Sequence, residues 1–159
     1  MNILDKKWKT RLIELTKLIA SWSKDPSTKT GALIVTKIGE PVSFGFNGFP
    51  KGVDDDESLY NNREFKLLAC EHAERNAIYQ ATVSLKGCVL YTTHHPCASC
   101  ARAIIQSGIT HVIIDESILI QDTGYNDRWT EELKVSKWLF NQANVTVLTS
   151  GDDNNEHKQ

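Results

Sequence analysis

The spacing of apolar positions along the chain predicts alternating helices and strands. Over residues 5–23, apolar side chains recur at intervals of three and four, which indicates an amphipathic helix with one buried face. The apolar positions of that face are Trp8, Leu12, Leu15, Ile19 and Trp22. Two apolar runs follow at residues 31–38 and 42–46, and the turn residues Gly39 and Pro41 between them predict a strand hairpin.

The second half of the chain alternates between helical and extended patterns. The predicted helices are residues 71–82, 97–107 and 128–141. The predicted strands are residues 88–92, 111–115 and 145–148. Strand–helix–strand alternation favours parallel strands joined by right-handed crossovers. We therefore predict an α/β fold, a three-layer α/β/α sandwich around a mixed five-stranded sheet.

Length and composition indicate one globular domain. The chain has 159 residues, of which 40% are hydrophobic and 24% charged, an ordinary balance for a globular protein. We predict a domain over residues 1–149 and a disordered polar tail over 150–159. A polar stretch over 47–62 is long for a loop in a compact domain, so we expect it to be functional or partly ordered.

Charge and hydropathy limit the classes of partner that the protein could bind and the compartments in which it could lie. No segment reaches the ~20 apolar residues that cross a bilayer, and the first residues lack an apolar secretory core. We therefore predict a cytoplasmic protein without a membrane partner. The formal net charge is −2 and no run of Lys or Arg occurs, which argues against a polynucleotide partner but not against a small nucleotide.

Two of the four cysteines form a Cys-x-x-Cys pair at the start of a predicted helix. Cys97 and Cys100 follow Pro96, so both sulfurs lie on one face of the first turn. The free amides and dipole of a helix start lower the pKa of a thiol and favour the thiolate. Two thiolates bind Zn²⁺ but leave its tetrahedral shell incomplete. A redox pair is the alternative at this point.

His72 is the natural third ligand, because it stands at the start of another predicted helix. Three protein ligands leave one position for water, which is typical of catalytic rather than structural zinc. Glu74, two residues later, is placed to reach that water without being a ligand. The alternatives are a structural zinc site and, for Glu74, an ordinary acidic residue in a first helical turn.

The His-x-Glu and Pro-Cys-x-x-Cys segments together match the signature of the zinc deaminases. The chain resembles the dCMP deaminase branch of the cytidine deaminase superfamily from about Trp8 to Leu148, through KDPSTKTGALIV, FGFNGFPKG, CEHAERNAI and TTHHPCASCARAIIQSGI. The resemblance implies hydrolysis of dCMP to dUMP and ammonia with one catalytic Zn²⁺ and Glu74 as the proton carrier. Cys70 falls where some phage members place a ligand for a second zinc, but a full set of partners is missing.

The resemblance also implies substrate contacts. Asn47 is expected to hold the sugar and base region, and Ala73 to contact the substrate beside the ligand histidine. Lys24 and Lys29 are candidates for the 5′-phosphate, and Tyr125 for packing on the base. The plain alternatives are a turn residue for Asn47 and solvated surface side chains for the lysines.

Regulation and assembly follow from the same resemblance. It implies a homo-oligomer, often a hexamer, that dCTP activates and dTTP inhibits, with Mg²⁺ accompanying the effector. We expect an effector site around Phe46, Gly48 and Lys51. Two other functions stay open: deamination of another cytosine species such as dCTP or cytidine, and a non-enzymatic zinc-binding module. The module predicts four protein ligands and a dispensable Glu74.

Overall fold

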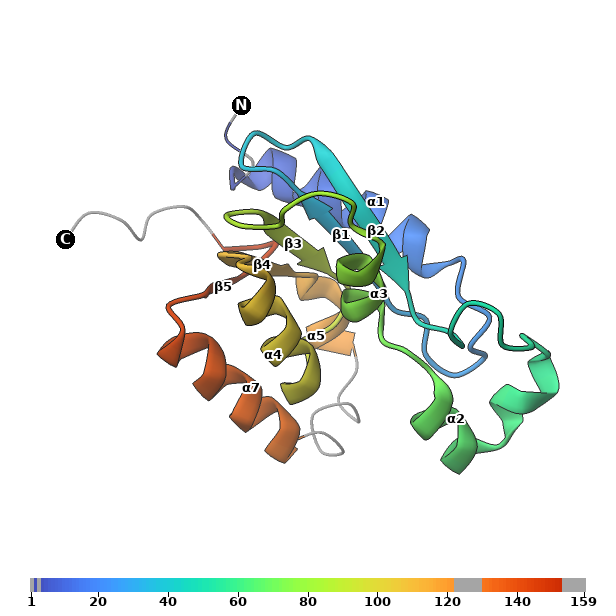
Figure 1. Cartoon of the computed structure of the whole chain (residues 1–159). Coiled ribbons are helices and arrows are strands. Elements are labelled where there is room, and N and C mark those ends of the chain that lie inside the picture. The colour runs from blue at the N-terminus through green and yellow to red at the C-terminus, as the bar shows by residue number, and fades with distance from the viewer. Residues whose placement is uncertain (1, 3, 122–129, 153–159) are drawn as a thin grey trace.

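A five-stranded mixed sheet forms the centre of the protein in this computed structural model, which describes residues 2, 4–121 and 130–152 (Figure 1). The strands are β1 (Gly31–Val35), β2 (Pro41–Phe46), β3 (Val89–Thr92), β4 (His111–Ile114) and β5 (Thr146–Thr149). Their order across the sheet is β2-β1-β3-β4-β5. Strand β1 is antiparallel to β2 and β3, whereas β3, β4 and β5 are parallel. The predicted mixed five-stranded sheet is confirmed.

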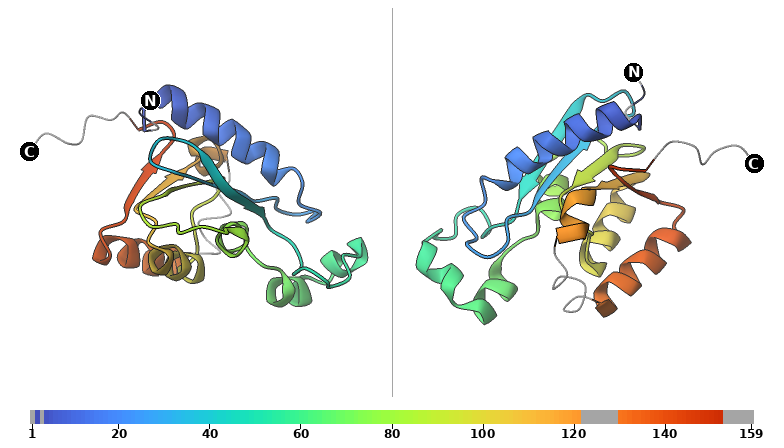
Figure 2. Two further views of the ribbon diagram at one scale, coloured as in Figure 1. Left: turned by 45° about the horizontal axis from the view of Figure 1, so that its top comes forward. Right: turned by 180° about the vertical axis from the view of Figure 1, so that it is seen from behind.

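Helices cover both faces of the sheet and give the predicted three layers. The helical segments are α1 (Lys6–Ala20), the 3₁₀ turn η1 (Glu57–Asn61), α2 (Arg63–Ala69), α3 (Ala73–Gln80), α4 (Ala98–Ser107), α5 (Glu116–Gln121) and α7 (Thr130–Gln142). Helices α3, α4 and α7 lie on one face, and α1 and α5 lie on the other (Figure 2). Gly108, in the left-handed conformation at φ 81°, ends α4 where the sequence predicts.

Two apolar cores follow from the alternation of side chains along the buried strands. On β1, Ala32 and Ile34 pack toward α3 and α4, together with the apolar face of α4. Leu33 and Val35 point the other way and pack with Leu12 and other residues of α1. Helices α3 and α4, which begin at His72 and Cys97, therefore pack on the same core, and α1 covers the opposite face of the sheet.

The buried face of α1 differs from the predicted one. Leu12 and Ile19 are buried as expected, but Leu15 and Trp22 are 37% and 47% exposed. Lys9, which is not part of the predicted apolar face, is fully buried and donates from Nζ to the carbonyl of Asp152. The apolar spacing predicted the helix correctly, but it did not predict which side of the helix faces the core. Lys9 can be buried because its ammonium group donates to the Asp152 carbonyl.

Among the described residues, the sequence pattern did not predict three helical segments: η1, α2 and α5. The segment formed by η1 and α2 extends away from the sheet (Figure 1). Leu68 on α2 is 90% exposed, so burial leaves no periodic pattern there for a sequence to display. The predicted strand 31–38 ends at Val35, because residues 36–40 form a turn closed by the Thr36 amide on the Glu40 carbonyl at 2.9 Å.

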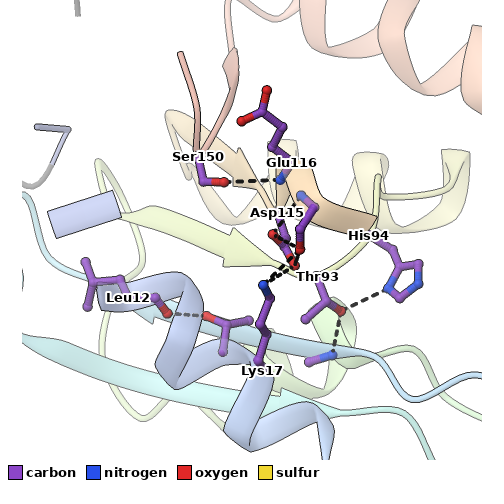
Figure 3. Close-up of polar contacts among 10 residues, drawn as sticks. Leu12, Lys17, Thr93, His94, Asp115, Glu116 and Ser150 are labelled. Carbon is purple, nitrogen blue, oxygen red and sulfur yellow. Dashed lines mark hydrogen bonds and ion pairs between the residues drawn. The ribbon is translucent and has the colours of Figure 1, made fainter. Parts of the chain in front are cut away.

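The first residues of the predicted tail are tied to the sheet. The Ser150 amide donates to the Ile114 carbonyl at 2.8 Å, and the Ser150 hydroxyl accepts from the Glu116 amide at 3.1 Å (Figure 3). In the same region, Lys17 pairs with buried Asp115 at 3.0 Å and links α1 to the end of β4. Residues 153–159 lie outside the described residues. Within the described part of the chain, no helix is both long and apolar enough to cross a membrane.

Candidate active site

Two helix starts meet on one face of the sheet and carry the candidate chemistry. His72 is the residue before the first turn of α3, and Cys97 has the same place on α4. Helix α3 lies close against β2 because Gly45 has no side chain. A Cβ at Gly45 would overlap the carbonyl oxygen of Ala73 and the amide nitrogen of Ala77. This contact sets how closely the His72 end of α3 approaches the sheet.

The imidazole of His72 lies between the two thiols. Its Nδ1 is 3.5 Å from the sulfur of Cys97 and 3.5 Å from the sulfur of Cys100. The three ligand atoms all lie within 4.8 Å of one another. Tetrahedral zinc, with bonds of about 2.1 Å to nitrogen and about 2.3 Å to sulfur, needs ligand atoms roughly 3.5–3.8 Å apart. The donor set and its spacing therefore fit one zinc ion.

The electrostatics of the cluster favour a thiolate. A hydrogen bond from the Cys100 thiol, assisted by His72, lowers the pKa of Cys97 to about 3 against the cost of burial. The same hydrogen bond raises the pKa of the Cys100 thiol, because that thiol is the donor, and burial raises it further. The pKa of His72 is raised, mainly by its hydrogen bond to Cys97. A divalent cation at this place would replace these protons.

Glu74 lies beside the three ligand atoms without joining them. Its side chain is buried, and its Oε2 lies 3.6 Å from the Cys100 sulfur. Burial raises the pKa of this carboxyl group above the usual value for glutamate. A carboxyl group next to a metal-binding cluster can hold and move protons, which is the role that the sequence predicts for Glu74.

The backbone before His72 is held by two neighbours. Glu71 pairs with Gly48 in a short antiparallel bridge, with amide-to-carbonyl distances of 2.8 and 3.2 Å. The Glu71 carboxylate accepts from the His72 amide at 3.0 Å and from Arg75 Nε at 2.6 Å. These bonds fix the entry of the chain into α3 and so the position of the His72 ring.

A cavity of about 370 Å³ opens onto this cluster. His72, Glu74 and Cys97 line it, and so do His94 and His95 from the end of β3. Residues 25–30 contribute Asp25, Pro26, Ser27, Thr28 and Thr30, and the η1–α2 region contributes Tyr60, Asn61, Arg63, Lys66, Leu67 and Cys70. The volume suits a small organic ligand.

The 25–30 loop and α2 are joined by a buried ion pair. Lys66 Nζ lies 3.1 Å from Asp25 Oδ1, and the two side chains are 11% and 6% exposed. Asp25 Oδ1 also accepts from the Ser27 and Thr28 amides at 2.8 and 3.2 Å. The cavity walls are therefore connected by a charged contact that only the tertiary structure reveals.

Asn47 lines the cavity and also builds it. Its Oδ1 accepts from the Thr30 amide at 2.8 Å, and its Nδ2 donates to the Thr28 carbonyl at 2.9 Å. Its own carbonyl accepts from the Ser23 hydroxyl at 2.8 Å. The side chain thus shapes the 25–30 loop, and its contact with the substrate stays a prediction.

The other predicted substrate and effector residues either do not line the cavity or lie outside the described residues. Lys24 and Lys29 are exposed and do not line the cavity, and Lys24 pairs with Asp55 at 2.8 Å. Ala73 is fully buried under the helix start. Tyr125 lies outside the described residues.

The predicted effector residues also lie off the cavity. Phe46 makes an edge contact with Trp22, their ring centroids 6.2 Å apart. Gly48 bridges to Glu71, and Lys51 is exposed. Their effector role stays a prediction.

Among the cavity residues that the sequence did not indicate, four are basic: Arg63, Lys66, His94 and His95. The two cations lie in α2, a helix the sequence reading missed. His94 and His95 follow β3 in the chain, and both are buried. His94 Nδ1 lies 2.9 Å from the Thr93 hydroxyl, which also accepts from the Gly31 amide at 3.1 Å (Figure 3). Their position directly before Pro96 and Cys97 was the signal that could have indicated them.

Comparisons with known proteins agree on one family. Residues 6–116 match the family model described as the cytidine and deoxycytidylate deaminase zinc-binding region. The chain is 45% identical over 141 residues to the "uncharacterized deaminase in luxG 3′ region" of Aliivibrio fischeri, covering 89% of this chain and 92% of that protein. It is 35% identical over 145 residues to human deoxycytidylate deaminase, covering 87% of this chain and 77% of the human protein.

A solved structure extends the likeness to the fold. The crystal structure of the dCMP deaminase from cyanophage S-TIM5, in complex with dCMP and dUMP, has a TM-score of 0.66 to this chain at 25% sequence identity. The match covers 90% of this chain and 96% of the cyanophage chain. The likeness therefore includes the sheet and the helices that carry the cluster.

Proposed function

The chain belongs to the cytidine and deoxycytidylate deaminase family, and we propose that it is a zinc-dependent hydrolase that converts dCMP to dUMP and ammonia. One observation carries the proposal: the ligand atoms of His72, Cys97 and Cys100 gather beside buried Glu74 at a cavity of about 370 Å³. Among the described residues, that group holds three ligand atoms and no more. Three protein ligands with a carboxyl group alongside are typical of catalytic zinc.

In the proposed reaction, His72, Cys97 and Cys100 bind the metal, and Glu74 transfers protons. A zinc ion held by the three ligands would supply a Lewis acid that lowers the pKa of a bound water to about 7. Glu74 takes one proton from the attacking water and delivers it to N3 of the cytosine ring while the water oxygen bonds to C4. It then moves the remaining proton of that oxygen to the exocyclic amine, whose bond to C4 breaks to release ammonia and leave the C4 carbonyl. The Cys100 sulfur lies 3.6 Å from Glu74 Oε2, so the carboxyl group is adjacent to the ligand atoms. Proton transfer of this kind contributes about 10²–10⁴-fold to a rate.

The cavity offers a place for an anionic substrate. Arg63 and Lys66 line it, and Arg63 makes no ion pair with any other described residue. Arg63 therefore takes the 5′-phosphate, because a guanidinium group binds phosphate oxygens in a bidentate manner. Lys24 and Lys29 remain the candidates that the sequence supplied for the same role. Comparing Arg63→Gln with Lys24→Gln and Lys29→Gln for a rise in the KM for dCMP decides among them.

Base and sugar contacts complete the proposal. Asn47, which lines the cavity, offers its amide to the sugar and base region, and Ala73 offers backbone groups beside His72. Tyr125 packs on the base.

Two measurements test the proposed reaction. The first is ammonia release from dCMP, CMP, cytidine and dCTP by zinc-loaded protein, with dCMP expected to give the highest kcat/KM. The second is Glu74→Gln, which keeps the shape of the side chain and removes its proton chemistry. This variant is expected to bind one zinc per chain and to lose nearly all turnover. Retention of more than a few per cent of the activity would remove Glu74 from the proposed role.

Rival functions make different predictions in the same experiments. A deaminase specific for dCTP or cytidine would prefer that compound over dCMP in the substrate panel. A non-enzymatic zinc-binding module would release no ammonia from any of them, and Glu74→Gln would change nothing. The three-atom ligand group favours the enzyme, because a closed structural site takes a fourth protein ligand.

Assembly, regulation and location belong to the same proposal. The protein is a cytoplasmic homo-oligomer, a hexamer, activated by dCTP and inhibited by dTTP with Mg²⁺ on the effector, and Phe46, Gly48 and Lys51 contribute to the effector site. A reducing compartment suits the zinc ligands, because Cys97 and Cys100 bind metal as thiolates only when they are not joined in a disulfide. Light scattering gives the oligomeric state. Sigmoidal dCMP kinetics that become hyperbolic with dCTP support the regulation, and kinetics unchanged by either nucleotide contradict it.

A further inference from the structure

Helix α7 holds the backbone on both sides of Cys97. The Ser136 hydroxyl donates to the Pro96 carbonyl at 2.7 Å, and Ser136 is fully buried. The Ala98 amide donates to Glu132 Oε2 at 3.1 Å. Pro96 and Ala98 are the two neighbours of Cys97 in the chain. Helix α7 lies alongside α4 (Figure 1), so both contacts join the C-terminal helix to the start of the ligand-bearing helix.

The contact from Glu132 satisfies the first amide of α4, which has no partner within the helix. A residue at the start of a helix usually accepts a hydrogen bond from the first free amides with its own side chain. Cys97 makes no such bond, and its sulfur instead lies 3.5 Å from His72 Nδ1. The α4 amide at Ala98 is bonded from another helix. A carboxylate there also complements the positive end of the α4 dipole.

The spacing of Glu132 and Ser136 on α7 allows both side chains to reach the backbone on either side of Cys97. Glu132 and Ser136 are four residues apart, so they lie one above the other on the same face of the helix. One accepts a hydrogen bond on the C-terminal side of Cys97, and the other donates one on the N-terminal side. The peptide units flanking the cysteine therefore have fixed positions, and the direction of its Cα–Cβ bond is fixed with them.

We infer that Glu132 and Ser136 are positioning residues for the zinc ligand Cys97, which they hold by clamping the Pro96 carbonyl and the Ala98 amide. The role rests on the proposed zinc site, but not on the identity of the substrate. Groups that orient metal ligands typically contribute about 10–100-fold to metal affinity. A mere packing role for α7 would instead lower stability and leave the affinity for metal unchanged.

The test measures metal binding separately from turnover. Metal-free full-length protein is titrated with Zn²⁺ in competition with a chromophoric chelator, and with Co²⁺ while the thiolate-to-cobalt absorption is recorded. Glu132→Ala and Ser136→Ala are expected to weaken zinc binding by about 10–100-fold and to alter the cobalt spectrum. Glu132→Gln keeps an oxygen that can accept from Ala98 and is expected to restore most of the affinity.

Glu131→Ala is the matched control. Glu131 adjoins Glu132 on α7, but its side chain is 84% exposed, and the one ion pair that it makes with a described residue is with Lys134 on the same helix. It is expected to bind zinc within twofold of the unmodified protein.

Each outcome decides the inference. If Glu132→Ala and Ser136→Ala bind zinc within twofold of the unmodified protein with an unchanged cobalt spectrum, the positioning role is wrong, whatever happens to thermal stability. Should Glu132→Ala fail to fold, Ser136→Ala, which removes one hydroxyl group, is judged by the same limits. If the unmodified protein binds zinc but releases no ammonia from dCMP, the proposed function fails, and the zinc affinities of the variants still decide the clamp.

Discussion

Replacing Lys66 by methionine is expected to destabilise the protein strongly, because it leaves Asp25 as an unpaired charge inside the fold. The two side chains are 11% and 6% exposed, and the charged atoms lie 3.1 Å apart. Removing one partner of a buried ion pair costs about 3–5 kcal/mol. Asp25 keeps its bonds from the Ser27 and Thr28 amides, so we expect the lower end, about 3 kcal/mol. For a chain of this length, that loss lowers Tm by roughly 6–12 °C.

The matched control is Lys24→Met. Lys24 also pairs with an aspartate, Asp55, at 2.8 Å, but these side chains are 51% and 44% exposed. Exposed pairs contribute about 1 kcal/mol or less, because water and salt screen them. Thermal and urea unfolding of the zinc-loaded proteins, followed by circular dichroism, compare the two variants directly.

A double variant separates charge from packing. Asp25→Asn combined with Lys66→Met removes both charges, so we expect it to recover part of the stability that Lys66→Met alone loses. If Lys66→Met costs no more than Lys24→Met, the ion pair does not connect the cavity walls, and the reasoning from burial is refuted.

Three further substitutions have definite expected outcomes. Gly45→Ala forces a methyl group onto the backbone of Ala73 and Ala77, so it should cost about 1–3 kcal/mol in urea unfolding and weaken zinc binding in a chelator titration. Asn47→Ala leaves a part-buried amide and a part-buried carbonyl of the loop without these hydrogen bonds, which should cost about 1–2 kcal/mol and raise the KM for dCMP. Arg63→Gln should raise the KM for dCMP at least ~10-fold and leave that for deoxycytidine nearly unchanged, because a bidentate charged contact contributes more than about 1.4 kcal/mol; equal effects on both compounds would contradict the phosphate contact.

Much of the fold was predictable because the decisive signals are local. The apolar runs at β1, β3 and β4 are fully or nearly fully buried, so their composition alone indicated strands. Gly108 is also a local signal. It indicated the end of α4, because the left-handed backbone conformation at that position favours glycine. Helix α2 left no such mark, because its side chains, such as Leu68, are largely exposed and its place is set by contacts with η1 and the 25–30 loop.

The candidate site also has a part that the sequence predicted and a part that it did not. His72 with Glu74, and Cys97 with Cys100, each lie within one turn of a helix start, so residue type and spacing predicted the chemistry of each segment. The lysines predicted for phosphate came from the 24–30 segment, yet neither lines the cavity. The cations that do, Arg63 and Lys66, were not predictable, because a charged residue in a sequence does not reveal whether it faces water or a cavity.

The sequence by itself determined the kind of protein: two helix starts with an imidazole, two thiols and a carboxyl group, on an alternating α/β chain. Local backbone geometry sufficed for that, because each motif is only three or four residues long. Only the tertiary structure decided which distant groups serve those motifs. Glu132 reaches the Ala98 amide across 34 positions, and Lys66 reaches Asp25 across 41. Such pairings depend on how helices pack on the sheet, and a polar side chain carries no signal of its partner until that packing exists.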